Sequence, residues 1–335
     1  MPTPSQLHVN TVITNGAAML PMSSTYICEG VFPRMSVDKQ SNIIPTIDPT
    51  GRLFRARSDI RSPGARAQTM DIGTDLTNTY FCQDHAIDMP LTDEEVGNVD
   101  PGLRAAINKA AMALKVILNN KEIAAVASVD AYFTGSLLDS TAQNWGSTSV
   151  DPVADINAAI ALIEDFSLRT PNTINMDIKL ARILCNHPAL QSRAGIYAAP
   201  NTSATELQAG IAGYKAMLSF IFGFDFVNIA KNASYNTATA DDATFAGSSI
   251  WGERVLLSFT EPINEMTGAT GATVVWNSGV PGAAGESGIL VRSIRDELAA
   301  STIMRAEQYY DIRMLRSTAF KAQTCGYLFS DTITP

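Results

Sequence analysis

The chain has 335 residues, of which 46% are hydrophobic, so it can build one large domain or two to three smaller ones with cores of their own. Charged residues make up only 17% of the chain, below the usual ~25%, which leaves much weakly polar surface for contact with other proteins. The 33 acidic and 24 basic side chains give a net charge of -9, which argues against a sequence-specific DNA-binding protein because such a chain repels nucleic acid.

Cysteine usage and hydropathy predict a soluble chain that is made in the cytosol. The four cysteines are far apart and form no CxxC pair: Cys28, Cys82, Cys185 and Cys325. We therefore expect free, buried thiols in a reducing compartment rather than a disulfide framework or a zinc site. The N-terminal segment lacks the basic start and the continuous apolar stretch of a signal peptide, and no segment approaches membrane-spanning length without a charge or a turn residue.

Residues 1–50 are rich in Pro, Thr, Ser and Asn, and their short apolar runs follow no sustained period. A segment of this kind does not bury enough apolar surface to order itself. The sequence therefore predicts an extended N-terminal arm that requires another surface.

Residues 51–90 show the clearest separation of charge in the chain, and they predict an extended hairpin loop. The first part sets five arginines against the single acid Asp59: Arg52, Arg55, Arg57, Arg61 and Arg66. From Ala67 to Asp100 there is no Lys or Arg, and acids accumulate, among them Asp71, Asp75, Asp84 and Asp88. Within this part, NTYFCQDHAIDMPL alternates as a strand does. A hairpin so poor in apolar residues builds no core of its own. We expect each portion to meet the oppositely charged portion of a neighbouring copy, in preference to contact of the arginines with nucleic acid.

A long helix is predicted at about 101–128, within a segment that runs from residue 91 to residue 150. Asp100 can cap this helix and Pro101 suits its first turn. Apolar residues follow at helical spacing: Leu103, Ala106, Ile107, Ala110, Leu114, Ile117 and Leu118. The many alanines would allow the helix to pack closely against a sheet.

Residues 151–288 mix helices and strands. A helix opens with Asp151 and Pro152, TPNTINM predicts a strand, DIKLARILCNHPAL predicts a helix ended by Pro188, and SATELQAGIAGY predicts a short helix. From residue 220 onward the signals are mostly strands, in DFVNIA, RVLLSF and ATVVW, and ILVRSI opens the last segment, 289–335. An arm, a hairpin, a long helix and a mixed segment that ends in strands indicate an α+β fold rather than regular βαβ alternation.

The stretch TIMRAEQYYDIRML, in the last segment, supports two opposite predictions. Its residues are good helix formers. Yet alternate residues divide into two faces, which is the period of a half-buried strand. One face is apolar apart from Gln308 (Met304, Ala306, Tyr310, Ile312 and Met314), and the other is mostly charged (Arg305, Glu307, Tyr309, Asp311 and Arg313).

The sequence offers little that predicts catalysis. Two of the three histidines, His8 and His85, have no nucleophile or metal-ligand neighbour at useful spacing. Cys185 and His187 form a conceivable nucleophilic pair, but residues two positions apart on a helix point in different directions. The glycine-rich stretches GATGATVV and GAAGESG lack the context of a phosphate-binding loop. We therefore expect a protein that is not an enzyme and that has no metal or cofactor.

Three stretches, in this order over most of the chain, resemble the major capsid proteins of tailed bacteriophages, which have the Hong Kong 97-type capsid fold. NTYFCQDHAIDMPLTDEEVGNVDP followed by GLRAAINKAAMALKVILNNKEIAAVAS resembles the return of the family's extended loop into its spine helix. PNTINMDIKLARILCNHPAL resembles a strand, helix and NHP turn found in many of these shell proteins. GILVRSIRDELAASTIMRAEQYYDIRMLRSTAFKAQTCGYLF resembles their C-terminal strands.

The resemblance implies an N-terminal arm (1–50), an extended loop (51–90), a peripheral domain with the spine helix (91–150), an axial domain (151–288) and C-terminal strands that complete the peripheral domain (289–335). It also implies self-assembly into hexamers and pentamers of an icosahedral phage head around double-stranded DNA. The chain would then be made and assembled in the host cytoplasm and reside in the virion. Candidate partners are scaffolding, portal and decoration proteins and DNA without sequence-specific contact, but no membrane.

The resemblance favours a strand for TIMRAEQYYDIRML. We expect its apolar face to pack on the spine helix near Leu114 and Ile117. The charged face should then be exposed where neighbouring subunits meet. The residues predicted to contact other subunits are Arg52, Arg55, Arg57, Arg61, Arg66, Asp71, Asp75, Asp84, Asp88, Arg305, Glu307, Asp311 and Arg313.

Some members of the family link their subunits covalently through a lysine on the extended loop, but this chain has no lysine from Arg52 to Asp100. We therefore expect a shell held without covalent lysine cross-links. Two alternatives stay open: an encapsulin-like nanocompartment shell that houses a protein cargo, and a cytosolic enzyme of unknown reaction that uses Cys185 and His187.

Overall fold

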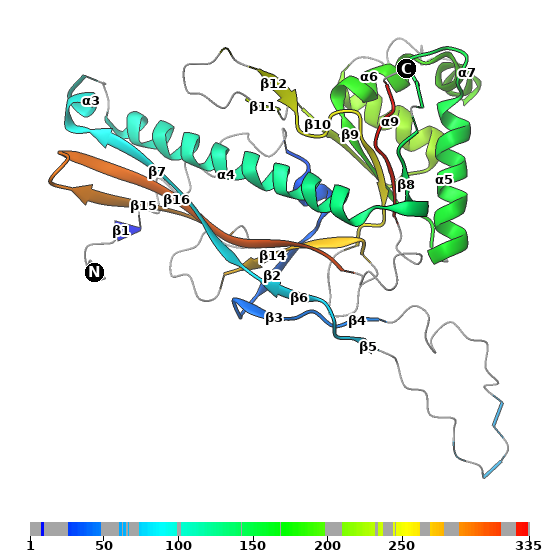
Figure 1. The fold of residues 1–335 in the computed structure, drawn as a ribbon, viewed down its shortest axis with the longest axis horizontal. Helices are drawn as coiled ribbons and strands as arrows, with labels where there is room; N and C mark the ends of the chain where they lie inside the picture. Colours follow the sequence, from blue (N-terminus) through cyan, green and yellow to red (C-terminus); the bar gives the residue numbers. More distant parts are fainter. Residues whose placement is uncertain are drawn as a thin grey trace.

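The computed structural model describes residues 8–9, 26–47, 60–61, 63–64, 66, 74–98, 102–141, 143–167, 169–197, 210–231, 234–236, 244, 246–261, 269–277, 288–315 and 326–333. Two units lie side by side (Figure 1). One is elongated and consists of long strands beneath a long helix. The other is a more compact unit of short strands and helices. Among the described residues, no helix has both the length and the apolar character needed to cross a membrane.

The elongated unit is built on β16 (Ser301–Met314), which pairs antiparallel with three strands. Strand β7 (Gln83–Thr92) lies along one edge of β16, and β15 (Ile289–Asp296) and then β14 (Gly271–Trp276) lie along the other. Two further strands complete the sheet: β2 (Arg34–Val37) pairs parallel with β14, and β1 (His8–Val9) pairs antiparallel with β15.

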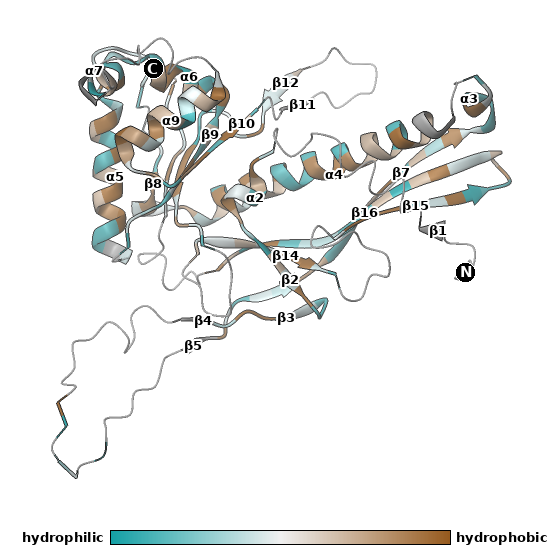
Figure 2. Cartoon of the chain, turned by 180° about the vertical axis from the view of Figure 1, so that it is seen from behind, coloured by the Kyte–Doolittle hydropathy of each residue, from teal (hydrophilic) through white to brown (hydrophobic). Residues whose placement is uncertain are grey.

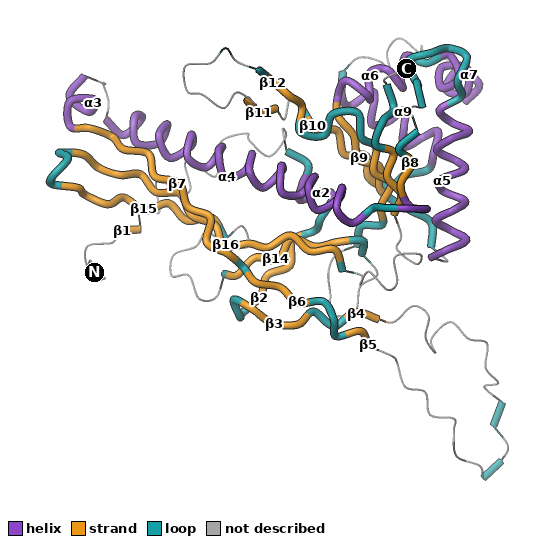
Figure 3. The backbone as a smooth tube through the Cα atoms, viewed as in Figure 1, coloured by secondary structure: helices purple, strands orange, loops and turns teal. Residues whose placement is uncertain are grey.

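Helix α4 (Gly102–Tyr132) runs along one face of this sheet, beside β7 and β16 (Figure 3). Leu114 and Ile117 are buried against Ala306 and Tyr310 of β16. Nearer the start of the helix, small alanines pack on Met304 and Val291, and this allows the helix backbone to approach the sheet closely. The helix shows alternating hydrophobic and hydrophilic bands (Figure 2). Burial of its apolar side, rather than propensity alone, stabilises so long a helix.

The compact unit contains a five-stranded sheet in the order β10 (Phe226–Ala230), β9 (Thr173–Asp177), β13 (Val255–Ser258), β17 (Gly326–Phe329) and β8 (Leu138–Asp139). Helices α5 (Pro152–Ser167), α6 (Ile178–Asn186), α7 (Pro188–Tyr197) and α9 (Ile211–Phe222) contribute to one core with it. Two aspartates define helix starts: Asp151 accepts the N–H of Val153 at 3.0 Å, and Asp177 accepts that of Lys179 at 2.8 Å.

Short elements connect and extend the two units. They are α2 (Cys28–Val31), α3 (Asp93–Asn98), the 3-10 turn Gly135–Leu137, and the strand pairs β3 (Ser41–Ile43) with β6 (Thr79–Phe81), β4 (Thr46–Ile47) with β5 (Thr74–Asp75), and β11 (Ser234–Asn236) with β12 (Gly247–Ser249). The core of α2 continues into α4 and the compact unit, because Ile27, Val31 and Phe32 pack with Val129 and Trp251.

The strand predicted for TIMRAEQYYDIRML (302–315) and the long helix predicted at about 101–128 are confirmed, as β16 and α4. The apolar face of β16 packs on α4 as expected, with Leu114 and Ile117 at the centre of the contact. The predicted helix in SATELQAGIAGY overlaps the start of α9, and its earlier residues lie outside the described part of the chain.

Two observations differ from the predictions. The arm was expected to order only on another surface, but residues 26–37 belong to the core and the sheet of their own chain. The charged face of β16 was expected to be exposed, and this is wrong for Glu307, which is 4% exposed. The three described cysteines, Cys28, Cys82 and Cys185, are free and buried as predicted.

Candidate functional site

The candidate site is the face of β7 and β16 that points away from α4. Side chains alternate along a strand, so burial of Ala306 and Tyr310 under α4 places Arg305, Glu307 and Asp311 on the opposite face. In the antiparallel register, Arg305 lies opposite Asp88, and Tyr309 lies opposite Asp84. Six predicted contact residues therefore come together here, two from β7 and four from β16: Asp84, Asp88, Arg305, Glu307, Asp311 and Arg313.

Arg305 and Asp88 form a two-pronged ion pair within the chain. Arg305 Nε lies 2.6 Å from Asp88 Oδ1, and its Nη2 lies 2.7 Å from Oδ2. Bonding to this guanidinium lowers the pKa of Asp88 below its usual value of 3.8. The two side chains are still 36% and 41% exposed. Each side chain already has the other as its ion-pair partner, so a neighbouring chain would meet a neutral pair rather than two free charges.

Glu307 lies in the interior of the same charged group. Its carboxylate is 3.3 Å from Arg292 Nε and 3.9 Å from Arg305 Nη1, and burial raises the pKa of Glu307 above its usual value. Arg292 comes from the adjacent strand β15, which the alternation of β16 alone does not reveal. Glu307 therefore pairs with arginines of the sheet to which it belongs.

Asp311 and Arg313 lie further along β16. Arg313 Nε is 2.7 Å from Asp311 Oδ2, and that oxygen also accepts the N–H of Phe81 at 2.9 Å. Asp311 thereby fixes the end of β6, just before β7, to the sheet. Arg313 is 47% exposed at its side chain and is the most accessible charge of the four on β16.

The loop residues are only partly described. Arg61 and Arg66 are exposed, and Asp75 lies in β5, whose pairing with β4 forms the base of the loop. Arg52, Arg55, Arg57 and Asp71 lie outside the described residues. The basic portion of the loop therefore stays a predicted partner for a neighbouring copy.

Cys185 and His187 do not form a nucleophilic pair. Cys185 lies in the core of the compact unit, where burial raises the pKa of its thiol to about 12. His187 Nε2 is 3.1 Å from the carbonyl oxygen of Ser147, and Nδ1 accepts the N–H of Ala189 at 3.2 Å, at the start of α7. Burial of Cys185 and the hydrogen bonds of His187 give both side chains a place within the fold. In the part of the chain that the structure describes, no group of His, Cys, Asp or Glu side chains is placed to hold a metal.

Two buried charged residues on α4, Lys121 and Glu122, were not predicted from the sequence. Lys121 and Glu122 are 1% and 0% exposed. Lys121 bonds Glu29 at 3.0 Å, and Glu122 accepts hydrogen bonds from the N–H groups of Ile27 and Cys28 and from the indole of Trp251. A signal was present, because Lys121 follows the inward-facing Ile117 by four residues and so shares its side of the helix.

We compared the sequence and the fold of this chain with those of known proteins. The sequence matches no protein-family profile and no curated protein. Among solved structures, a phage-related protein from Bordetella bronchiseptica RB50 is 19% identical, with a TM-score of 0.69 over 98% of this chain and 99% of that one. The chain has the Hong Kong 97-type capsid fold.

Two further structures share this capsid fold at lower similarity. A chain from Mycobacterium phage Bobi is 11% identical, with a TM-score of 0.52 over 93% of this chain and 92% of that one. The holo-SrpI encapsulin complex from Synechococcus elongatus PCC 7942 is 9% identical, with a TM-score of 0.53 over 91% of this chain and 87% of that one. The capsid fold is thus common to phage chains and to an encapsulin.

Proposed function

We propose that the chain is a major capsid protein, which self-assembles into hexamers and pentamers of an icosahedral phage head that encloses double-stranded DNA. The observation that carries the proposal is the end-to-end match, at a TM-score of 0.69, to a phage-related protein. In this proposal the elongated unit is the peripheral domain, the compact unit is the axial domain, and the protein is structural rather than catalytic.

The charge of the chain supports this role. A net charge of -9 keeps the subunit from adhering to the DNA that must be packed inside the shell. The chain is then made and assembled in the host cytoplasm and resides in the virion. Its partners are other copies of itself, with scaffolding, portal and decoration proteins as further candidates.

The shell is held without covalent lysine cross-links. The extended loop has no lysine from Arg52 to Asp100, so its basic portion binds the acidic portion of a neighbouring loop by charge alone. Fully denatured particles should therefore run as a single band of subunit size on a denaturing gel. A ladder of linked subunits would contradict this part of the proposal.

An encapsulin-like compartment is the second candidate, and the similarity to the Synechococcus complex favours it. The genes beside this one separate the two: portal and terminase genes support a phage head, and a gene for a cargo enzyme supports a compartment. A cytosolic enzyme is the least supported alternative, because Cys185 and His187 are both engaged within the fold.

Size-exclusion chromatography with light scattering tests the proposed function. We expect the expressed chain to elute as megadalton shells or as capsomers of five and six subunits. A stable monomer, dimer or tetramer at every concentration and salt level would contradict it.

A further inference from the structure

His85 lies in the contact between β7 and α4. It is on the face of β7 that points toward α4, in line with Ile87 and Met89, which pack against the core that α4 forms with β16. The imidazole is half-buried and stacks on the ring of Tyr310 of β16, with ring centroids 4.1 Å apart and an angle of 18° between the ring planes. His85 is therefore part of the attachment of β7 to the rest of the elongated unit.

A buried positive charge lies beside the same tyrosine ring. Lys121 of α4 is 1% exposed, and its Nζ is 5.2 Å from the centroid of Tyr310. Glu29 accepts a hydrogen bond from this Nζ at 3.0 Å, so Lys121 already has its counter-charge. A proton on His85 would place a second positive charge near Lys121, on an imidazole that has lost part of its contact with water.

Two carboxylates near His85 favour its protonated form. Asp84 precedes His85 on β7 and Asp311 lies on β16, and the alternation of side chains places both on the opposite face of the sheet. Burial of the imidazole has the larger effect, and with the charge of Lys121 it lowers the pKa of His85 below its usual value of 6.5. The neutral form of His85 is thus the one that fits between β7 and α4.

We propose that protonation of His85 loosens the first half of β7, Gln83–Ile87, from α4 and β16, so that the attachment of this strand depends on pH. When the strand opens, the imidazole enters water and regains its usual pKa, and protons therefore bind the open form more tightly than the closed form. The attachment is complete above pH 6.5 and weakens as the pH falls from 6.5 through the lower pKa of the closed form. A difference of one unit between the two pKa values corresponds to a roughly tenfold larger open population.

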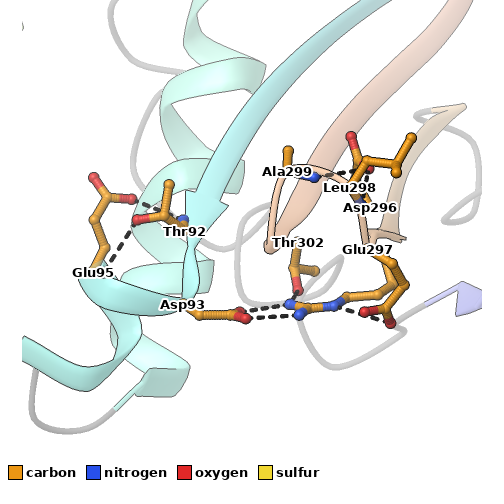
Figure 4. Close-up of polar contacts among 9 residues, drawn as sticks. Thr92, Asp93, Glu95, Asp296, Glu297, Leu298, Ala299 and Thr302 are labelled. Atoms are coloured by element: carbon orange, nitrogen blue, oxygen red, sulfur yellow. Dashed lines mark hydrogen bonds and ion pairs between the residues drawn. The ribbon is translucent and has the colours of Figure 1, made fainter.

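The second half of β7 is held by ion pairs that persist in mildly acidic solution. Asp88 binds Arg305 in the middle of the strand, and just beyond its end Asp93 binds Arg295 through both carboxylate oxygens, at 2.5 and 2.7 Å (Figure 4). The bonded arginines hold the pKa of Asp88 and of Asp93 below the usual 3.8, so both carboxylates stay charged. We therefore expect the loosening in Gln83–Ile87 and not in the residues that follow Asp88.

Proton NMR of the unassembled subunit measures the pKa of His85 directly. The sequence contains three histidines, His8, His85 and His187, so the imidazole signal that disappears in His85→Gln belongs to position 85. We expect this signal to titrate with a midpoint below 6.5, the usual pKa of histidine. A midpoint at or above 6.5 would overturn the proposal, because protonation would then not weaken the closed form.

Hydrogen exchange with detection by mass spectrometry measures the attachment of the strand, at about pH 5.5 and about pH 7.5, after correction for the intrinsic effect of pH on exchange. In the wild type, the amides of Gln83–Ile87 should exchange several-fold faster at the lower pH, and those of Met89–Thr92 should keep their rate. His85→Phe retains an aromatic ring beside Tyr310 but takes up no proton, so its exchange should not depend on pH. His8→Gln removes a different histidine and should behave like the wild type.

The outcomes separate this proposal from the proposed function. Equal exchange of Gln83–Ile87 at both pH values in the wild type would overturn it, and so would the same pH dependence in His85→Phe. If the phenylalanine variant does not fold, His85→Gln provides the same comparison with a polar side chain. Both measurements use the subunit alone, so their result does not depend on whether the chain forms a shell.

Discussion

Lys121 and Glu122 are consecutive on α4, yet both are almost completely buried. Lys121 bonds Glu29 at 3.0 Å and lies 5.2 Å above the ring of Tyr310. Glu122 accepts hydrogen bonds from Ile27 N at 3.0 Å, Cys28 N at 2.9 Å and Trp251 Nε1 at 2.6 Å. Burial raises the pKa of Glu122, although these bonds favour its charged form. The pair therefore joins the N-terminal segment, the long helix and the loop before β13.

Replacing the two members of the Glu29–Lys121 pair one at a time should have unequal effects on stability. Glu29→Gln leaves the ammonium group of Lys121 buried without the carboxylate that it bonds and should lower the free energy of unfolding by about 2 kcal/mol. This is less than for a fully buried pair because Glu29 is partly in solvent. Lys121→Met keeps the shape of the side chain and removes the buried charge, so it should change stability by less than ~1 kcal/mol or increase it. Urea unfolding of unassembled subunits measures both.

The effect of Glu29 should also depend on pH. Burial alone would raise the pKa of Glu29, but Lys121 and Arg34 together hold it below its usual value of 4.5. Its contribution to stability is then complete above pH 4.5 and disappears as the pH falls through the lower folded pKa. The unfolding curves of the wild type and Glu29→Gln should converge in acid. A difference that stays constant across this range would contradict the assigned cause.

The partners of these residues could not be predicted from the sequence, because they lie 92, 95 and 129 residues away along the chain. Helical spacing does place Lys121 on the inward side of α4. It does not reveal that Glu29 is the partner of Lys121, because the apolar residues around Glu29 follow no sustained period. Only the tertiary fold brings the two together.

At the scale of elements, β16 illustrates how burial overrides propensity. Its residues are good helix formers, but apolar and charged side chains alternate along it. As a strand it therefore buries the apolar side chains against α4 and holds the charged side chains on the opposite face. The alternation correctly predicted both the strand and its contact with Leu114 and Ile117. It failed for Glu307, because the exposure of this residue depends on Arg292 of the neighbouring strand. The alternation of side chains along one strand does not reveal which strand lies beside it.

The two faces of β16 should respond very differently to substitution. Ala306 is fully buried against α4, so Ala306→Asp would place a charge in an apolar contact and should cost about 3 kcal/mol or more. Arg313→Ala, on the opposite face, removes a partly exposed ion pair and should change stability by about 0.5 kcal/mol. Thermal unfolding compares them, and equal losses would mean that the faces are assigned wrongly.

At the scale of the whole molecule, the order of arm, hairpin, long helix and strands predicted an α+β fold, and the resemblance of three stretches to phage capsid proteins predicted the capsid fold. The pattern is readable because α4 and β16 are long and strongly periodic. For the candidate site, the sequence predicted the charged face of β16 but not the partners of its side chains within the chain. Asp88 and Arg305 bind each other, since charges that are distant in sequence can be neighbours across a sheet. Their contact with other subunits stays a prediction.

The charges of residues 51–90 are still predicted to pair with those of a neighbouring copy. Reversal of Arg55, Arg57 and Arg61 to glutamate should weaken assembly, and the loss should depend on ionic strength because salt screens exposed charges. A triple variant in the compact unit, Arg169→Glu, Arg182→Glu and Arg193→Glu, changes the net charge equally and serves as the control. Light scattering during assembly measures the effect, and unchanged assembly of the loop variant would remove the role of loop pairing.

Electron microscopy of the purified chain tests the central claim most directly, namely that copies of this chain build a closed shell. We predict hollow, roughly spherical particles of uniform size, or rings with fivefold and sixfold symmetry when assembly is incomplete. Small oligomers without such symmetry, or open filaments, would contradict the account.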